Sequence, residues 1–289
     1  MEDYLVRGVG VGGQFRVFAA VTTSLVEEAR QRHDTWPVAT AALGRVLTAG
    51  LLLGANLKGE DLLTLRVYGD GPLGAIIVSA TAGGEVRGYV QEPHVDLPCE
   101  RTGKLPVGEA VGKGLLHVTK DLGLKEPFTG SIELVSGEIG EDVAQYLLTS
   151  EQTPSAVSLG VLVGPDARVK AAGGLLLQLF PGAEEKLLTH LEQNITSMPP
   201  VSSLINSELS PEGLVARAVN GLDIHYLDKY PVRFVCKCTR EKVGDILAAM
   251  GKEELEKPLA EQGQVEVRCH FCGEKYTFSG PDLQAIVKA

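Results

Sequence analysis

The sequence has no excess of positive charge. Its formal net charge at pH 7 is −10, whereas a nucleic-acid surface needs clustered Lys and Arg that displace counterions from phosphates. We therefore expect no nucleic-acid partner. Hydrophobic residues make up 44% of the chain and charged residues 22%, which are ordinary values for a globular protein. A chain of 289 residues can form one large domain and one small domain.

The sequence also lacks a long apolar run without charge. The most apolar stretch, residues 37–57, contains Arg45 and three glycines. A charge at the centre of a membrane helix costs about 2.5–3.5 kcal/mol on insertion scales, so we expect a buried core helix and no membrane partner. The first residues, MEDYLVRG, lack the basic start and apolar run of a signal peptide. We therefore expect a cytoplasmic protein.

Motifs of common enzyme sites are missing. Residues 7–15, RGVGVGGQF, mimic a G-x-G-x-x-G phosphate loop, but the residues that follow alternate like a strand, whereas that loop must open a helix. A glycine-rich turn is the better interpretation. The sequence has no P-loop, and no set of Ser, His and Asp that sequence alone can defend as a catalytic triad. We therefore expect no enzymatic activity.

Cysteine is scarce, yet four of the five cysteines stand in two close pairs. One residue separates Cys236 from Cys238, and two residues separate Cys269 from Cys272. Thiols stay reduced in the cytoplasm, where clustered cysteines are metal ligands or redox-active groups rather than structural disulfides. Cys99 stands alone in the sequence DLPCE, and we assign no role to it.

The expected fold class is α+β, with a large N-terminal α/β domain over residues 1–179 whose sheet is mainly antiparallel. Short β-rich runs separated by glycines predict strands, and apolar periodicity with polar caps predicts helices. The predicted strands cover 62–69, 73–80, 85–91 and 130–137, followed by a hairpin of 155–164 and 169–180. The predicted helices cover 22–33, 37–55 and 139–151.

A helical linker is expected over residues 180–232. One helix over 183–198 and a second that begins at Pro211 each have an apolar face. Such short helices are unstable in isolation, so they must lie on another surface. Two interpretations remain open: an ordinary connector, or a metastable segment that unfolds when a neighbouring part does.

Residues 233–289 are expected to form a small C-terminal domain around the cysteines. An amphipathic helix over 243–250 and a second helix over 253–263 precede two alternating strands that flank the later cysteine pair. The spacing C-x-C followed by C-x-x-C fits a tetrahedral Zn²⁺ site with four thiolate ligands. The proposed ligands are Cys236, Cys238, Cys269 and Cys272. Structural zinc supplies an apparent ~10–16 kcal/mol of folding free energy.

Four thiolates and one Zn²⁺ carry a net charge of −2. We expect basic residues near the cysteines to offset this charge and to lower the pKa values of the thiols. These basic residues are Lys237, Arg240, Arg268 and Lys275.

Each tight pair of cysteines can also close into a local disulfide if the metal leaves. Such disulfides would not preserve the link between the earlier and the later cysteine pair.

Three blocks resemble the redox-regulated 33-kDa heat-shock chaperonin family. They are residues 141–163, 221–238 and 265–278, and the resemblance covers the whole chain. It implies an ATP-independent holdase that is inactive while reduced and zinc-bound. It also implies that oxidants form the disulfides Cys236–Cys238 and Cys269–Cys272, release zinc, and unfold the C-terminal domain and linker. The oxidised form is then expected to dimerise and to bind unfolding client proteins.

The client-binding surface is expected on the apolar faces of the linker helices, together with the apolar surface of the first domain that the folded linker covers. The candidate residues are Leu187, Leu188, Leu191, Ile195, Leu214, Val215 and Val219.

Two other functions compete with this prediction. A thiol–disulfide oxidoreductase could use Cys269 and Cys272, but such enzymes place C-x-x-C at a helix N-terminus, whereas a strand is predicted to follow here. A constitutive zinc ribbon could bind nucleic acid or protein. The C-terminal segment has as many acidic as basic residues, so it lacks the excess positive charge of a nucleic-acid-binding domain.

Overall fold

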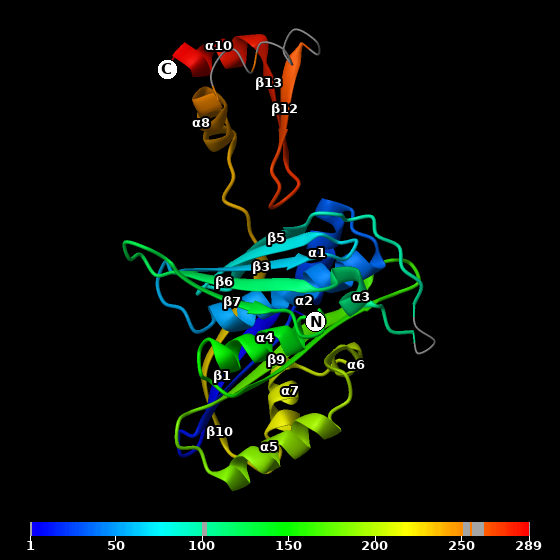
Figure 1. Ribbon diagram of the computed structural model, residues 1–289, viewed down its shortest axis with the longest axis vertical. Helices are drawn as coiled ribbons and strands as arrows, with labels where there is room; N and C mark the ends of the chain where they lie inside the picture. The colour runs from blue at the N-terminus through cyan, green and yellow to red at the C-terminus, as the bar shows by residue number, and fades with distance from the viewer. Residues whose placement is uncertain (1, 100–102, 251–254, 256–262, 289) are drawn as a thin grey trace. The chain divides into compact units, whose positions relative to one another are not determined.

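The structure is a computed structural model that describes residues 2–99, 103–250, 255 and 263–288. It divides into two compact units, Met1–Val235 and Cys236–Ala289. The first unit contains two large sheets, and the second contains one hairpin with helices beside it in the chain (Figure 1). Nearly all neighbouring strands are antiparallel, which confirms the predicted α+β class.

The first sheet has the strand order β10-β1-β2-β9-β8, and every neighbouring pair in it is antiparallel. Its strands are β1 (Tyr4–Gly10), β2 (Phe15–Val21), β8 (Ser155–Val163), β9 (Val169–Leu179) and β10 (Ile224–Pro231). Gly12 and Gly13 connect β1 to β2 with φ angles of +94° and +67°, which glycine adopts readily. The glycines of residues 7–15 therefore serve a hairpin turn, as predicted.

The second sheet has the order β11-β5-β4-β3-β6-β7, and only the β11–β5 pair is parallel. Its strands are β3 (Leu62–Gly69), β4 (Ala75–Thr81), β5 (Glu85–Val90), β6 (Gly114–Asp121), β7 (Phe128–Glu133) and β11 (Arg233–Phe234). The prediction of a strand over 62–69 is confirmed. The strand predicted over 130–137 covers Phe128–Glu133 instead. Leu134 N still donates to Gly114 O of β6, but from Val135 on the backbone N–H groups donate to the side chain of Asp142.

A long apolar helix packs against both sheets of the first unit. Helix α2 (Pro37–Gly54) contacts β3, β4 and β5 of the second sheet and β8 and β9 of the first. All of its residues except Pro37 and Arg45 are buried. Although α2 is long and apolar enough to cross a membrane, it lies almost entirely inside the unit, as predicted for a core helix. The charge of Arg45 is paired with Glu138, with 2.7 Å between Nη1 and Oε2.

The other helices of the first unit complete its layers. They are α1 (Thr23–His33), α3 (Val107–Val111), α4 (Gly140–Thr149), α5 (Glu185–Ser197), α6 (Val201–Asn206) and α7 (Pro211–Ala218). The last three belong to the expected linker, and their apolar faces pack on the face of the first sheet formed by β1, β2 and β9. The sequence analysis required these short helices to lie on another surface. That surface is the first sheet of the same unit.

After the linker helices, the chain forms two strands that the sequence analysis did not anticipate. Residues 224–231 form β10, which pairs with β1 along its whole length, and the register shifts once between Arg7 and Gly8. Two residues further on, β11 pairs with β5 of the second sheet, and Val235 N donates to Val86 O. The sequence IHYLDKYP lacks a clear two-residue alternation, so its extended form depends on pairing with β1.

One buried carboxylate organises the loop between β7 and α4. Asp142 is 1% exposed, and its oxygens accept the backbone N–H groups of Val135, Ser136, Gly137 and Ile139 at 2.7–3.3 Å. Gly137 and Ile139 have positive φ angles of +71° and +70°, a conformation that is unfavourable for a β-branched residue. The hydrogen bonds to Asp142 offset that strain.

The second unit is small. It contains α8 (Arg240–Met250), β12 (Gln264–Arg268), β13 (Lys275–Ser279) and α10 (Gly280–Lys288), and β12 pairs with β13 as an antiparallel hairpin. The helix predicted over 253–263 lies outside the described residues except Leu255 and Gly263. The described core is a single cluster of Val243, Leu247, Leu255, Val265, Phe278 and Leu283.

We predict that Asp142→Ala lowers the free energy of unfolding of the first unit by about 2–3 kcal/mol, because buried N–H donors lose a charged acceptor. The measurement is urea unfolding followed by the fluorescence of Trp36, the only tryptophan. Glu141→Ala is the matched control, because Glu141 is the exposed neighbour. Equal stability of the two variants would contradict this role for Asp142.

The stability of the first unit should also depend on Glu27. Hydrogen bonds from Arg30, together with those from Val169 N and Gln31, lower the pKa of Glu27 from 4.5 to about 2. A depressed pKa means that this stabilisation is complete above pH 4.5 and is lost as the pH falls towards 2. Because this pair is near the surface, we expect a contribution of no more than about 1 kcal/mol.

The corresponding measurement is the urea unfolding free energy of the wild type and Glu27→Gln between pH 7 and pH 2. The stability difference between them should shrink below pH 4.5. If the unfolding free energies of the two proteins differ by the same amount at every pH in this range, Glu27 does not contribute in this way.

Candidate metal centre

The four paired cysteines converge in the second unit. Cys236 and Cys238 precede α8, whereas Cys269 and Cys272 lie in the turn between β12 and β13. The Sγ atoms of Cys236 and Cys269 are 3.8 Å apart, and those of Cys238 and Cys272 are 3.3 Å apart. All four Sγ atoms lie within 4.8 Å of one another. The fold thus brings together cysteines that are 33 and 34 positions apart in the sequence.

This arrangement fits a tetrahedral thiolate site. Four sulfurs at the usual zinc–sulfur distance of about 2.3 Å are separated from one another by about 3.8 Å. The observed separations lie around this value, and Cys272 is 3% exposed while the other three are half-buried. A set of four sulfur donors favours Zn²⁺ or another thiophilic ion over Mg²⁺ or Ca²⁺. The residues present can therefore hold the predicted type of metal ion.

The hairpin turn holds the later pair in place. Gly273 N donates to Cys269 O at 2.8 Å, and Cys269 N donates to Glu274 O at 2.9 Å. Gly273 has a φ of +73°, which closes the turn and leads the chain into β13. The C-x-x-C sequence is thus followed by a strand, as predicted. It does not lie at a helix N-terminus, where a thioredoxin-like enzyme places its nucleophile.

Burial increases the proton affinity of the later cysteine pair. Burial raises the pKa values of Cys269 and Cys272 above the ordinary cysteine value, so these sulfurs favour the protonated form when no cation is near. Metal ligands must be thiolates. Binding of a cation is therefore coupled to proton release from these cysteines, and the affinity for the metal should fall as the pH is lowered.

A tyrosine that sequence analysis missed contacts the sulfurs. Tyr276 Oη lies 3.2 Å from Cys238 Sγ and 3.3 Å from Cys238 O. The hydrogen bond to Cys238 is the main cause that raises the pKa of Tyr276, so its hydroxyl stays a donor to the sulfur. Only its position on β13, three residues beyond Gly273, brings the ring to the site, and no motif in the sequence indicates this.

Three of the four basic residues expected to offset the thiolate charge form contacts with carboxylates or the backbone. Arg240 Nη2 lies 3.1 Å from Asp282 Oδ2, Lys275 Nζ lies 3.0 Å from Glu266 Oε1, and Arg268 Nε donates to Gly273 O. Arg240 also lies over the ring of Phe278, 4.3 Å from its centroid. The expectation that these cations lower the thiol pKa values is wrong for Cys269 and Cys272, where desolvation is the larger effect.

The lone cysteine lies elsewhere in the chain. Cys99 belongs to the first unit and is exposed. It is a free thiol, and the described residues do not place it in the four-cysteine cluster.

The seven candidate client-binding residues are mostly covered in this structure. Leu191, Leu214, Val215 and Val219 are at most 2% exposed, in the cluster with the first sheet. Leu187 and Ile195 are partly buried beside them, whereas Leu188 is exposed. The four buried residues can contact another polypeptide only if the helices leave the sheet.

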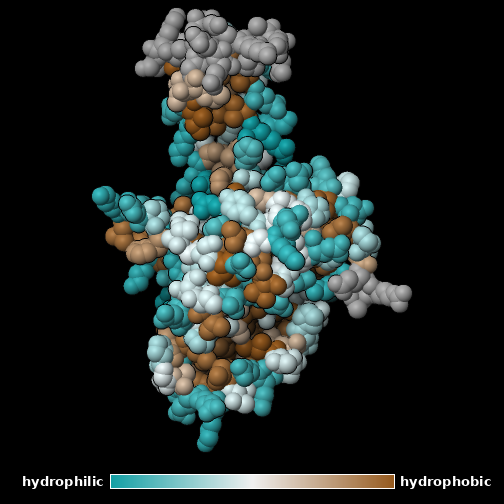
Figure 2. Space-filling view, viewed as in Figure 1, coloured by the Kyte–Doolittle hydropathy of each residue, from teal (hydrophilic) through white to brown (hydrophobic). Residues whose placement is uncertain are grey.

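One apolar groove of the first unit remains open beside these helices. It has a volume of about 470 Å³ and lies between α4, the ends of β8 and β9, and α5. Leu148, Leu177, Leu188 and Ile195 line it. Figure 2 shows apolar side chains gathered on this part of the surface, surrounded by more polar residues. Part of the candidate surface is thus accessible in the folded form.

Comparison with known proteins gives one family. The family model described as Hsp33 protein matches residues 3–279. The 33 kDa chaperonin of Desulforamulus reducens is 62% identical over 288 residues, covering 100% of this chain and 98% of the relative. That of Geobacillus kaustophilus is 49% identical over 287 residues, covering 99% of this chain and 98% of the relative.

A solved structure agrees with these sequence matches. The crystal structure of the 33 kDa chaperonin (heat shock protein 33 homolog) from Thermotoga maritima superimposes with a TM-score of 0.94 at 36% identity. The match covers 100% of this chain and 98% of the other. With the family model spanning nearly the whole sequence, the chain belongs to the Hsp33 family of 33 kDa chaperonins.

Proposed function

We propose that this protein is a redox-regulated, ATP-independent holdase that binds unfolding proteins and prevents their aggregation. Membership of a chaperonin family supports the chaperone activity. The observation that carries the regulation is the convergence of four thiols from two segments of a small unit. We further propose three functional parts: a core domain over 1–179, a metastable linker over 180–232 and a redox-switch domain over 233–289.

In the reduced protein, the four cysteines of the cluster hold Zn²⁺. Bound Zn²⁺ would neutralise part of the thiolate charge and link the segment before α8 to the β12–β13 turn. The described apolar core of this unit contains six buried residues, and domains of this size need a metal or a disulfide for stability. The link between the two cysteine pairs therefore supplies most of the stability of the C-terminal domain.

Oxidation removes the ligands from the metal. In each pair two thiolates lose two electrons and form one S–S bond, and hydrogen peroxide accepts the two electrons with two protons and leaves as two water molecules. The proposed bonds are Cys236–Cys238 and Cys269–Cys272, which are the pairs closest in sequence. Each bond closes a loop of only a few residues. The two disulfides therefore restrict the unfolded chain very little and do not replace the long-range link.

Unfolding of the C-terminal domain is proposed to destabilise the linker. Cys236 follows Val235, whose backbone N–H is bonded to β5, so the anchored part of the chain ends where the cysteine site begins. Detachment of α5, α6 and α7 would uncover their own apolar faces and the sheet face beneath them. These surfaces are proposed to bind clients, and the oxidised protein is proposed to form a homodimer through newly exposed apolar area.

Metal removal should unfold the C-terminal domain selectively. We expect one Zn²⁺ per chain in the reduced protein. A strong chelator under reducing conditions should abolish amide-exchange protection in 240–250 and 264–279, because ~10–16 kcal/mol of apparent stabilisation is lost. Protection in α2 should persist. Cys272→Ser is expected to have the same effect without chelator, whereas Cys99→Ser should behave like the wild type. Unchanged protection after complete metal loss would refute the structural role.

Oxidation should activate the protein. Reduced protein and peroxide-treated protein are compared at raised temperature for their ability to suppress aggregation of a chemically unfolded model protein, without ATP. We expect suppression only after oxidation, accompanied by zinc release and by the two local disulfides in peptide mapping. The variant Cys236→Ser/Cys238→Ser should no longer respond to peroxide. Equal suppression before oxidation, or a disulfide between the two pairs in a domain that stays folded, would contradict the switch.

A further inference from the structure

One edge of the first sheet lacks the features that usually prevent strand addition. An exposed edge strand offers unpaired N–H and C=O groups, and proteins protect such edges with charges, proline or short strands. The edge strand β8 has nine residues, SAVSLGVLV, with no charged residue and no proline. At the opposite edge of the same sheet, β10 carries Asp228, Lys229 and Pro231. The edge of β8 therefore lacks the charges and the proline of β10, and its register with β9 is regular from Ser155 to Leu162, where it shifts.

The register identifies which backbone groups of β8 point outward. Leu179 N donates to Pro154 O at 3.0 Å, and bonded pairs of an antiparallel ladder recur at every second residue. Ser158 and Gly160 are therefore bonded to β9, whereas the N–H and C=O groups of Leu159 and Val161 point away from it. Within the described parts of the chain, none of the hydrogen bonds outside the sheet ladders engages these outward groups.

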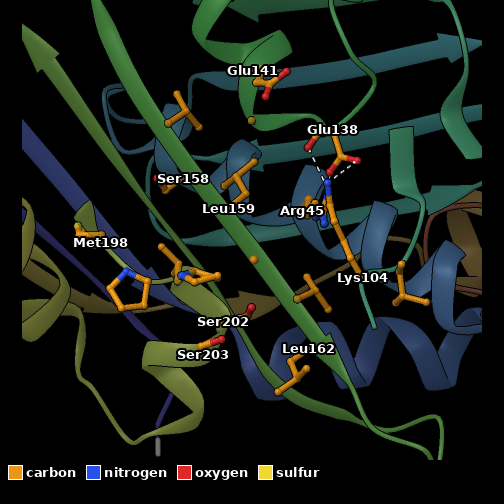
Figure 3. Close-up of a pocket in the computed structure, with 18 of the residues that line it drawn as sticks. Arg45, Lys104, Glu138, Glu141, Ser158, Leu159, Leu162, Met198, Ser202 and Ser203 are labelled. Atoms are coloured by element: carbon orange, nitrogen blue, oxygen red, sulfur yellow. Dashed lines mark hydrogen bonds and ion pairs between the residues drawn. The ribbon is translucent and has the colours of Figure 1, made fainter. Parts of the chain in front are cut away.

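A groove runs along β8. It has a volume of about 600 Å³ and is lined by residues 157–163 of β8, by residues 198–203 on one side of the strand, and by Arg45, residues 103–105, Glu138, Gly140 and Glu141 on the other. Figure 3 shows Leu159 and Leu162 on β8, with Met198, Ser202 and Ser203 across from them. At one end, a Cβ atom added to Gly140 would lie 3.4 Å from Val157 O, so the start of α4 adjoins the edge at Val157 and the open part begins beyond this residue.

The charges beside the groove compensate one another. Arg45 Nη1 and Lys104 Nζ lie 2.7 Å and 3.1 Å from the two carboxylate oxygens of Glu138 (Figure 3), and Glu141 also lines the groove. The groove therefore has no excess charge that would select an anion or a cation. Its apolar residues and unpaired backbone groups instead match the alternating donors and acceptors of an extended polypeptide.

We propose that the edge of β8 from Leu159 to Val163 binds an extended segment of an unfolding polypeptide, which joins the first sheet as an additional strand. This inference rests on the proposed holdase function. Backbone hydrogen bonds are independent of side-chain sequence, which suits a surface that binds clients of many sequences. Because residues 198–203 form one wall of the groove, release of the linker widens the groove and strengthens binding.

The close packing of the linker on β8 supports this opening. A Cβ atom at Gly160 would lie only 2.7 Å from Ser202 N, so α6 contacts the backbone of β8 directly. When α6 leaves, this stretch of β8 becomes accessible from the sheet face as well as from the edge.

The probe is a fluorescein-labelled ten-residue peptide of alternating Val and Thr, measured by fluorescence anisotropy with the full-length oxidised protein. Its partner has the four central amides N-methylated, which removes backbone donors but keeps the side chains. We expect the methylated peptide to bind at least tenfold more weakly. Equal affinity of the two peptides would overturn strand addition.

Two variants locate the site. Leu162→Lys adds a charge to the open edge, and Leu115→Lys adds one to β6, which is paired on both sides. Leu162 and Leu115 have similar exposed fractions, 38% and 41%. Leu162→Lys should weaken peptide binding at least tenfold and reduce aggregation suppression, while Leu115→Lys should match the wild type. Wild-type affinity in Leu162→Lys would overturn the assignment.

Further outcomes separate this inference from the proposed function. If the oxidised wild type fails to suppress aggregation, the holdase proposal fails. If the wild type suppresses aggregation and Leu162→Lys does so equally, only the strand-addition site is wrong. If Leu162→Lys abolishes dimerisation in sedimentation velocity yet binds the peptide normally, the edge accepts a second copy of this chain and the client site is overturned.

Discussion

The C-terminal unit depends on one constraint, the convergence of four sulfur atoms from two separate segments. The contacting cysteines are 33 and 34 positions apart in the sequence. Without that meeting, a hairpin and a few short helices would be held by one small apolar cluster. A metal–thiolate link is strong only while its sulfurs are reduced. In the proposed mechanism, the same four atoms would stabilise the fold and respond to oxidants.

The first unit does not share this dependence. Its two sheets enclose α2, whose side chains are almost all buried, and its loops are held by buried groups such as Asp142. The linker belongs structurally to this unit, since β10 pairs with β1 and the helices cover the sheet. Detaching the linker requires these contacts to break. Detachment would therefore release apolar surface on both the linker helices and the sheet, as the proposed activation requires.

The two edges of the first sheet differ in chemistry. The β10 edge belongs to the linker and carries charges and proline, whereas the β8 edge belongs to the core and carries neither. A core that stays folded while its linker detaches would keep β8 in place as a rigid template. Strand addition and apolar contact would then act together on the same client, since the groove beside β8 contains both unpaired backbone groups and apolar side chains.

The sequence by itself determined several local elements and the four cysteines of the candidate metal centre. Apolar periodicity placed α2 and α5, glycines placed the β1–β2 turn, and the cysteine spacing selected the four sulfurs, because each of these depends on residues close together in the chain. Tertiary structure alone decided that 224–231 is a strand, that Tyr276 contacts Cys238, that Arg240 and Lys275 pair with carboxylates, and that β8 lies at an open edge. These features depend on which distant residues become neighbours, and local patterns carry no information about that.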